Sequence, residues 1–424
     1  MSRRARRGGG RELEVTVVGI GARGDGLAKL ADGTPLFVPQ ALPGERLRVR
    51  IAAKSEAGLR GDILELLHQS PDRLDPTCPN GARCGGCLFQ TWAPAAQAAW
   101  KGAQVQAAVA RAGFDPALVQ ARVEPAQAGR RRARFHAAGG KLGFRERRSH
   151  DIIALGPCQT LGAELRAFWR AVQGLPCLEI SAEWTVTATP AGLDIAVQTK
   201  EKSPPPRGEG QDLIAALAGF TPLARLTWNG DLLAEIDAPR IDLGGLAPIL
   251  PPGGFLQPSE GGQAALQALV LAALPPSAHW VADLYCGMGT FAVPLAARGH
   301  RVQALESYEP AVAALDAAVR RDPSNRFKIH LGLRNLDRYP LQGGELEGFD
   351  AVIFDPPRGG ARAQANHLAQ SAIPRLVAVS CNPSTWARDA ALLREGGYAL
   401  TAVTPVDQFP QTPHLELVSL FTRC

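Results

Sequence analysis

Beyond a Pro-Pro-Gly-Gly sequence at residues 251–254, apolar stretches of strand character alternate with helical stretches. We expect strands at residues 279–285 and 301–305, with a glycine turn and a helix between them, at residues 287–298. This alternation is typical of a parallel sheet that is covered by helices on both faces. Ligands bind such sheets outside the carboxyl ends of the strands. The sequence therefore predicts a doubly wound domain over residues 251–424, with a site at that edge.

Three reactive side chains lie where predicted strands end or begin. Asp355 follows the apolar residues 351–354, and Cys381 follows residues 376–379. Glu416 opens the last apolar stretch, which would form a hairpin with residues 399–406. If that last strand is antiparallel to the others, its start lies at the edge where the parallel strands end. An acid, a nucleophile and a base would then converge on one pocket.

The glycine turn carries a weaker signal. Gly287 and Gly289 permit close backbone approach to a ligand, and Glu306 is placed to accept hydrogen bonds from ribose hydroxyls. Both nicotinamide dehydrogenases and class I S-adenosylmethionine methyltransferases share these features, and Glu306 could instead cap the following helix. The Asp-Pro-Pro sequence at residues 355–357 and the final hairpin favour a methyltransferase. Cys381 points the same way, because a dehydrogenase has no obvious use for it.

The N-terminal stretch, residues 12–67, consists of short strands that are separated by glycines. Arginines at positions 46, 48 and 50 alternate with apolar residues, which predicts a strand with one basic face in a small barrel. The layout resembles a TRAM domain, an OB-like RNA-binding barrel. The residues that carry this resemblance are Gly24-Asp25-Gly26, Pro39 and Gly44-Glu45-Arg46. A barrel without a ligand is the alternative.

Three of the 8 cysteines, Cys78, Cys84 and Cys87, have a C-x5-C-x2-C spacing among prolines and glycines. In a chain without an export signal, this spacing indicates a metal centre rather than disulfides. Both zinc and a [4Fe–4S] cluster need a fourth ligand, and the spacing does not distinguish them. Cys158 lies in a turn, whereas Cys177 lies in an apolar stretch and is interpreted as a buried hydrophobe.

The charge distribution suits a polyanionic partner. The 46 basic residues exceed the 40 acidic ones, which gives a net charge of +6. The excess is concentrated in three arginine clusters, which favour nucleic acid binding. These clusters are Arg3, Arg4, Arg6 and Arg7; Arg130, Arg131, Arg132 and Arg134; and Arg145, Arg147 and Arg148. With no secretory signal and no long apolar stretch, we expect a cytoplasmic, monomeric protein.

The intervening region, residues 68–250, is predicted to form a second domain. Residues 93–113 are helical in character and could pack on the catalytic domain, and Gly113 is a plausible stop. Residues 130–246 are mostly strands, with one helix near residues 161–172. We therefore predict three domains, at residues 12–67, 68–250 and 251–424.

Together these motifs resemble the RNA uracil-C5 methyltransferases, above all the TRAM-bearing, iron–sulfur 23S rRNA members. The motifs are the barrel, the cysteines, Phe255-Leu256-Gln257, the segments 283–289, 355–358 and 380–383, Phe409-Pro410 and His414-Leu415-Glu416. The resemblance implies a multidomain α/β protein. It would have an N-terminal OB-like TRAM barrel, a central strand-rich iron–sulfur domain and a C-terminal Rossmann-like class I methyltransferase domain.

The resemblance also implies roles for individual residues. Cys381 would be the nucleophile and Glu416 the base. S-adenosylmethionine would contact Gln257, Tyr285, Thr290, Glu306, Asn335 and Asp355. A [4Fe–4S] cluster would be held by Cys78, Cys84, Cys87 and Cys158. Ser259 stands where the family usually has an asparagine, and Thr290 replaces the asparagine of some relatives.

The chemistry of uracil explains why a thiol and a base are needed together. A thiolate that adds to C6 makes C5 nucleophilic enough to take a methyl group. A base such as Glu416 must then remove the C5 proton so that the thiol can leave. The substrate would be RNA, expected to be 23S rRNA, with a flipped or single-stranded uridine. Two alternatives remain: a nicotinamide-dependent iron–sulfur redox enzyme, and a non-catalytic RNA-binding or ribosome-assembly factor.

Overall fold

The computed structural model describes residues 10–423 except 56–57, 127–128, 148, 155, 157, 205–207 and 220–221. The chain forms two compact units, one of residues 1–101 with 409–413, the other of residues 102–408 with 414–424. Five arginines of the predicted clusters lie outside the described residues: Arg3, Arg4, Arg6, Arg7 and Arg148. No described helix combines the length and the apolar character that a membrane crossing needs.

The first unit contains a closed five-stranded barrel, as predicted. Its strands, in the order β1-β2-β3-β5-β4, are β1 (Glu12–Ile20), β2 (Gly26–Lys29), β3 (Pro35–Val38), β5 (Gly58–His68) and β4 (Arg46–Ser55). The alternation on β4 is confirmed, because Leu47 and Val49 are buried while Arg48 is exposed. Arg48 pairs with Glu65 at 3.0 Å, and Arg50 pairs with Glu12 at 2.6 Å. Carboxylates therefore offset part of the basic face that the sequence predicted.

Helix α1 (Pro94–Arg111) contributes residues to both units. In the first unit, Trp100 packs against a cluster that includes Phe89 and Trp92. In the second unit, Val105 and Val109 are fully buried in the core beside one face of the C-terminal sheet. Gly113, with φ +83°, follows the helix as the sequence predicted, since this left-handed conformation is common just after a helix.

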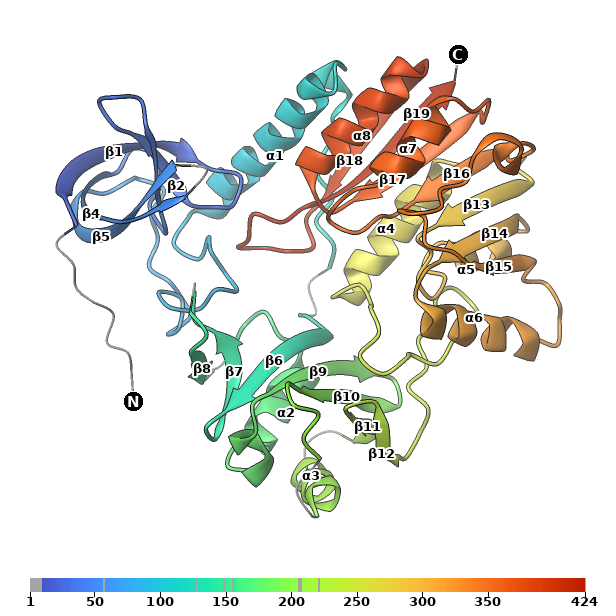
Figure 1. The fold of residues 1–424 in the computed structure, drawn as a ribbon, viewed down its shortest axis with the longest axis horizontal. Helices are drawn as coiled ribbons and strands as arrows, with labels where there is room; N and C mark the ends of the chain where they lie inside the picture. The colour runs from blue at the N-terminus through green and yellow to red at the C-terminus, as the bar shows by residue number, and fades with distance from the viewer. Residues whose placement is uncertain are drawn as a thin grey trace. The chain divides into compact units, whose positions relative to one another are not determined.

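The central part of the second unit is a seven-stranded sheet in the order β12-β11-β10-β9-β6-β7-β8 (Figure 1). The strands are β6 (Arg132–Ala138), β7 (Lys141–Arg145), β8 (Ile152–Ala154), β9 (Ala182–Thr189), β10 (Gly192–Thr199), β11 (Leu223–Trp228) and β12 (Asp231–Glu235). Two helices, α2 (Ala163–Ala171) and α3 (Glu209–Leu217), pack on its core. The sequence predicted only the first of them. The short apolar stripe of α3, Leu213 and Leu217, follows a segment rich in proline and glycine, which is not typical of a helix.

The C-terminal part of the second unit is another seven-stranded sheet, in the order β15-β14-β13-β16-β17-β19-β18. Its strands are β13 (Trp280–Leu284), β14 (Arg301–Glu306), β15 (Ile329–Leu333), β16 (Ala351–Phe354), β17 (Arg375–Ser380), β18 (Tyr398–Val406) and β19 (Glu416–Arg423). The first five are parallel, and β19 runs antiparallel to both β17 and β18. The predicted final hairpin is therefore confirmed, and the start of β19 lies at the edge where β16 and β17 end.

Helices cover both faces of this sheet (Figure 1). One core contains side chains of α4 (Glu260–Ala272), α5 (Ala292–Ala297) and α6 (Glu309–Arg321). The other contains side chains of α1, α7 (Arg362–Ala369) and α8 (Pro383–Glu395). Neighbouring strand residues such as Val352 and Ile353 belong to opposite cores, because side chains alternate along a strand. The barrel, the strand-rich centre and the Rossmann-like sheet confirm the predicted fold class.

Candidate active site

A cavity of about 540 Å³ opens at the carboxyl edge of the C-terminal sheet. All eight of the catalytic and cofactor-binding candidates line it: Gln257, Tyr285, Thr290, Glu306, Asn335, Asp355, Cys381 and Glu416. They come from seven separate segments, and most of these segments meet because the sheet topology brings the strand ends to one edge. The size is that of a pocket for a small molecule of drug or cofactor dimensions.

The turn after β13 has a strained backbone. Tyr285 adopts φ 63°, a value that non-glycine residues rarely take, and Gly287 and Gly289 follow with φ 56° and 94°. A Cβ on Gly289 would lie 2.9 Å from Leu315 Cδ2, so this position has no room for a side chain. The Tyr285 hydroxyl donates to Asp337 Oδ1 at 3.3 Å, and burial raises the pKa of Tyr285. The strain is held in place by this packing and lets the backbone approach a ligand.

Glu306 holds both the glycine turn and the connection that leads into α6. Its Oε2 accepts a hydrogen bond from Gly287 N at 3.0 Å. Its Oε1 accepts from Ser307 N at 2.6 Å and from Tyr308 N, the residue before α6, at 2.8 Å. These bonds hold the residues before α6 rather than the first amide groups of the helix, and the side chain also lines the cavity and keeps lone pairs for a ligand.

Two arginines where β6 begins, Arg131 and Arg132, hydrogen-bond the segment that carries Gln257. Arg131 Nε donates to the carbonyl of Gln257 at 3.2 Å. Arg132 donates to the carbonyls of Gly253 and Gly254, both at 3.1 Å. Burial lowers the pKa of both guanidinium groups. These arginines belong to a cluster that was predicted to bind RNA. Their hydrogen bonds also position the cavity wall, a role that no sequence pattern indicated.

Ser259 also has a local structural role. It is the N-cap of α4, and its hydroxyl accepts a hydrogen bond from Gly262 N at 3.1 Å. Serine is among the residues that best satisfy the first amide groups of a helix. The serine at this position therefore starts the helix that follows the Gln257 segment.

The electrostatics at the strand ends favour neutral side chains. Burial, together with the charges of Glu416 and Asp355, raises the pKa of Cys381 to about 11. Burial and the charge of Asp355 raise the pKa of Glu416 to about 8, and burial raises that of Asp355 to about 7. The Arg358 guanidinium opposes these shifts at both Cys381 and Glu416. A cationic ligand in this cavity would favour the thiolate and the carboxylates further.

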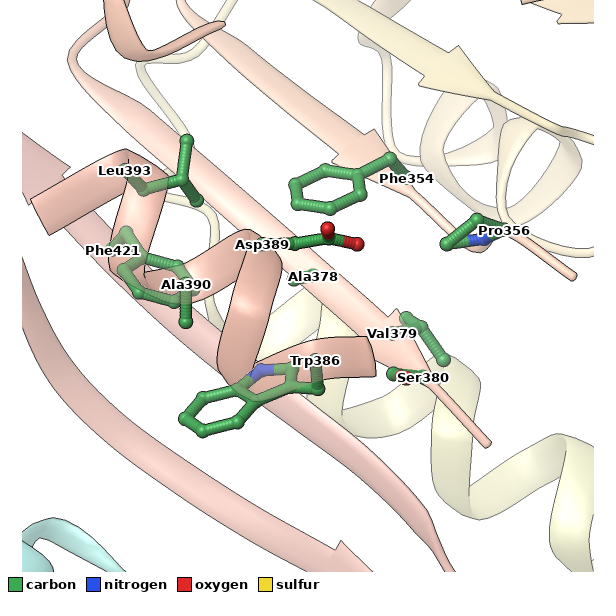
Figure 2. A pocket seen from close by; sticks show the side chains of 10 residues that line it. All are labelled: Phe354, Pro356, Ala378, Val379, Ser380, Trp386, Asp389, Ala390, Leu393 and Phe421. Atoms are coloured by element: carbon green, nitrogen blue, oxygen red, sulfur yellow. The ribbon is translucent and has the colours of Figure 1, made fainter. Parts of the chain in front are cut away.

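Helix α8 fixes the loop that carries Arg358. The carbonyl of Arg358 accepts from Asn382 Nδ2 at 3.1 Å and from Thr385 Oγ1 at 3.3 Å. Asp389 Oδ2 accepts from Ala361 N at 2.7 Å, and its side chain points from α8 toward the end of β16 (Figure 2). The hollow around Asp389 is only about 10 Å³, so it has no room for a ligand larger than one water molecule. Asp389 and Asn382 therefore stabilise the loop of residues 358–361 through hydrogen bonds to its backbone and do not line the large cavity.

The cysteines predicted to bind metal belong to different units, Cys78, Cys84 and Cys87 to the first and Cys158 to the second. Cys84 and Cys87 are buried, and Gly86 N donates to Cys84 Sγ at 3.4 Å. Cys158 Sγ lies 3.3 Å from Thr160 Oγ1. Among the described residues, no group of three or more His, Cys, Asp or Glu side chains is arranged to hold a metal ion. The buried thiols and their amide donor suit a thiolate-bound cluster, but the cluster stays a prediction.

Comparisons with known proteins agree with this geometry. A family profile described as tRNA (Uracil-5-)-methyltransferase matches residues 251–424, and a TRAM domain profile matches residues 6–64. An uncharacterized RNA methyltransferase of Caulobacter vibrioides is 39% identical over 422 residues, which cover 97% of this chain and 100% of the relative. The 23S rRNA (uracil(1939)-C(5))-methyltransferase RlmD of Edwardsiella ictaluri is 32% identical over 426 residues, which cover 96% of this chain and 95% of that protein.

A solved structure shares the fold. The crystal structure of Pyrococcus abyssi tRNA (uracil-54, C5)-methyltransferase in complex with S-adenosyl-L-homocysteine matches with a TM-score of 0.75 at 22% identity. The match covers 96% of this chain and 99% of that one. The likeness of fold and the full-length sequence relatives lead to one conclusion: the chain belongs to the family of RNA uracil-C5 methyltransferases.

Proposed function

We propose that this protein transfers a methyl group from S-adenosylmethionine to C5 of a uridine in RNA, through a covalent bond between Cys381 and C6. One observation carries the proposal: Cys381 and Glu416 line the same cavity as the glycine turn and Glu306. A thiol, a base and a nucleoside-binding wall are the groups that this reaction requires. S-adenosylmethionine, when bound, supplies the methyl group as an electrophile.

Cys381 adds as a thiolate to C6 of the uracil ring, and the electrons of the C5–C6 double bond move toward O4. C5 of the resulting enolate would then take the methyl group: the C5–CH3 bond forms, the bond between the methyl group and the sulfonium sulfur breaks, and S-adenosylhomocysteine leaves as a neutral thioether. Glu416 then takes the proton from C5, the C5–C6 double bond forms again, the C6–S bond breaks and the thiolate of Cys381 is released. Burial and the nearby carboxylates raise the pKa of Cys381 to about 11, so the thiol must release its proton to solvent before it adds to C6, and the positive charge of Arg358 favours this step.

RNA that contains 5-fluorouridine tests the covalent step, because fluorine at C5 cannot leave as a proton. With S-adenosylmethionine present, the wild type should form a protein–RNA adduct on a denaturing gel, and Cys381→Ala should not. With ordinary RNA, Glu416→Gln should accumulate the adduct that the wild type resolves. Absence of an adduct from wild-type protein that binds the RNA would eliminate the thiol as nucleophile.

We further propose 23S rRNA as the substrate. The support is the Edwardsiella ictaluri relative, whose name specifies uracil 1939 of 23S rRNA and which is 32% identical over nearly the whole chain. Ribosomal RNA and tRNA from a strain that lacks this protein should be offered separately. Methylation of tRNA but not of 23S rRNA would refute the choice of substrate while leaving the chemistry intact.

We also propose that Cys78, Cys84, Cys87 and Cys158 hold a [4Fe–4S] cluster that supports the fold or RNA binding. The C-x5-C-x2-C spacing and the amide donor at Cys84 support this set of ligands. Protein purified without oxygen should contain about four irons and show the visible absorption of an iron–sulfur cluster, and Cys84→Ser should remove both signals. Stoichiometric zinc instead of iron would overturn the assignment.

A further inference from the structure

Gln408 bridges two residues of the proposed active site. It follows β18 and is 2% exposed. Its Nε2 donates to Gln257 Oε1 at 2.9 Å. Its side-chain amide also lowers the pKa of the nearby Glu416 carboxyl group. An amide lowers the pKa of a carboxyl group when its N–H side faces that group, so the nitrogen that serves Gln257 also faces Glu416.

The orientation of this amide is determined by its surroundings. Within the described part of the chain, Gln408 Oε1 has no hydrogen-bond partner. That oxygen occupies the space beside Gly262, where a Cβ would collide with it. Turning the amide over would bring this oxygen toward Gln257 Oε1 and the Glu416 carboxylate, both acceptors. The observed orientation is therefore the one that pairs donors with acceptors.

The same bond determines what Gln257 offers to a ligand. Because Gln257 Oε1 accepts from Gln408, its amide nitrogen is left to donate on the other side. Gln257 lines the cavity, so it presents N–H groups there rather than a carbonyl. N–H donors suit a uracil carbonyl oxygen or a carboxylate or hydroxyl of the methyl donor.

We propose that Gln408 is a positioning residue that acts on both sides of the cavity, holding the Glu416 carboxylate for proton removal and fixing Gln257 as a hydrogen-bond donor. The inference rests on the proposed function, in which Glu416 is the base. Gln408 touches neither substrate nor methyl donor in this scheme, and it acts through the two residues that do. Apart from Gln408, the groups whose charges or dipoles act on Glu416 are Asp355, Arg358 and Cys381.

Gln408→Met, which keeps the size of the side chain but removes its donors, tests both roles. Proton removal from C5 should slow about tenfold, the effect of losing one hydrogen bond to a charged group. The covalent adduct should then accumulate on ordinary RNA, and RNA deuterated at uridine C5 should show a larger isotope effect than with the wild type. Affinity for S-adenosylhomocysteine, measured by calorimetry, should fall about twofold, because Gln257 then divides its time between two orientations.

Gly262→Ala provides an independent second variant, since it displaces the Gln408 amide while keeping the residue. It should reproduce the larger isotope effect and the adduct. Gln364→Met is the matched control: Gln364 is fully buried and hydrogen-bonds Leu341 N and O at 2.9 and 3.1 Å, away from the cavity lining. Its isotope effect should equal that of the wild type.

A double-mutant cycle distinguishes an effect that Gln408 exerts through Gln257 from a nonspecific disturbance of the structure. If Gln408 acts through Gln257, the loss of S-adenosylhomocysteine affinity in Gln408→Met should not add to that in Gln257→Met. The inference is overturned if folded Gln408→Met and Gly262→Ala keep the wild-type isotope effect and show no adduct while the wild type and Gln364→Met form 5-methyluridine. A wild type that forms no 5-methyluridine would instead refute the proposed function.

Discussion

Replacing Glu416 by glutamine should stabilise the fold at neutral and alkaline pH while it stops turnover. Burial, with the charge of Asp355, raises the pKa of this carboxyl to about 8, against an ordinary value of 4.5. Between these two pH values the native protein keeps a proton that the unfolded chain releases. The free energy of unfolding must therefore fall as the pH rises through this window, and it should level off above pH 8.

The size of the effect follows from the two pKa values. Each pKa unit corresponds to 1.36 kcal/mol. Keeping this proton should therefore cost the native state about 3 kcal/mol at pH 7, and giving it up in the buried site should cost at most about 5 kcal/mol above pH 8. The amide of Glu416→Gln does not titrate, and it keeps the size of the side chain and an acceptor oxygen. The variant should therefore gain little at pH 5 and progressively more as the pH rises.

Native-state hydrogen exchange of β19, measured at pH 5, 7 and 9 and corrected for the intrinsic pH dependence of amide exchange, reports the local free energy of unfolding around Glu416. The exposed Glu347→Gln variant is the control for the loss of a negative charge. The difference in protection between Glu416→Gln and the wild type should grow across the series, whereas Glu347→Gln should show no such trend. A difference that is constant from pH 5 to pH 9 would refute the reasoning.

Three other substitutions or treatments test the cavity. Arg132→Met removes two charge-assisted hydrogen bonds to the Gly253 and Gly254 carbonyls, so S-adenosylhomocysteine binding measured by calorimetry should weaken about tenfold. Arg134→Met is the control: it loses only an exposed ion pair with Glu183 and should keep the wild-type affinity. Gly289→Ala should weaken the same binding by about 1–3 kcal/mol because its Cβ meets Leu315. Gly299→Ala has a similar φ, +95°, but open space, so equal losses in the two would attribute the effect to backbone strain alone. Alkylation of Cys381 by iodoacetamide should accelerate about tenfold per pH unit up to its pKa of about 11, and a plateau near pH 8 would contradict the raised pKa.

The sequence predicted the parts of the site that follow from topology. Asp355, Cys381 and Glu416 each border an apolar strand, so an antiparallel last strand was enough to bring them together. The helix α3 was missed, because two leucines are too few to reveal a helix after a proline-rich segment. The roles of Arg131, Arg132 and Gln408 were also missed. Their partners are backbone carbonyls or amides more than 120 positions away, and such contacts leave no periodicity or spacing to detect.

The pairing of β17 with β19 gives the site a sensitivity to insertions that substitutions do not reveal. Ser380 lies opposite Leu417, and Glu416 opens β19 beside Val406 of β18. Side chains alternate between the two faces of a strand, so a slip of β19 by a single residue would bring Leu417 to the place of Glu416 and turn every later side chain to the other core. A one-residue insertion or deletion just before Glu416 would thus erase the base without changing any amino acid of the cavity. Gene comparisons and engineering in this family should therefore track the length of that connection as strictly as the glutamate itself.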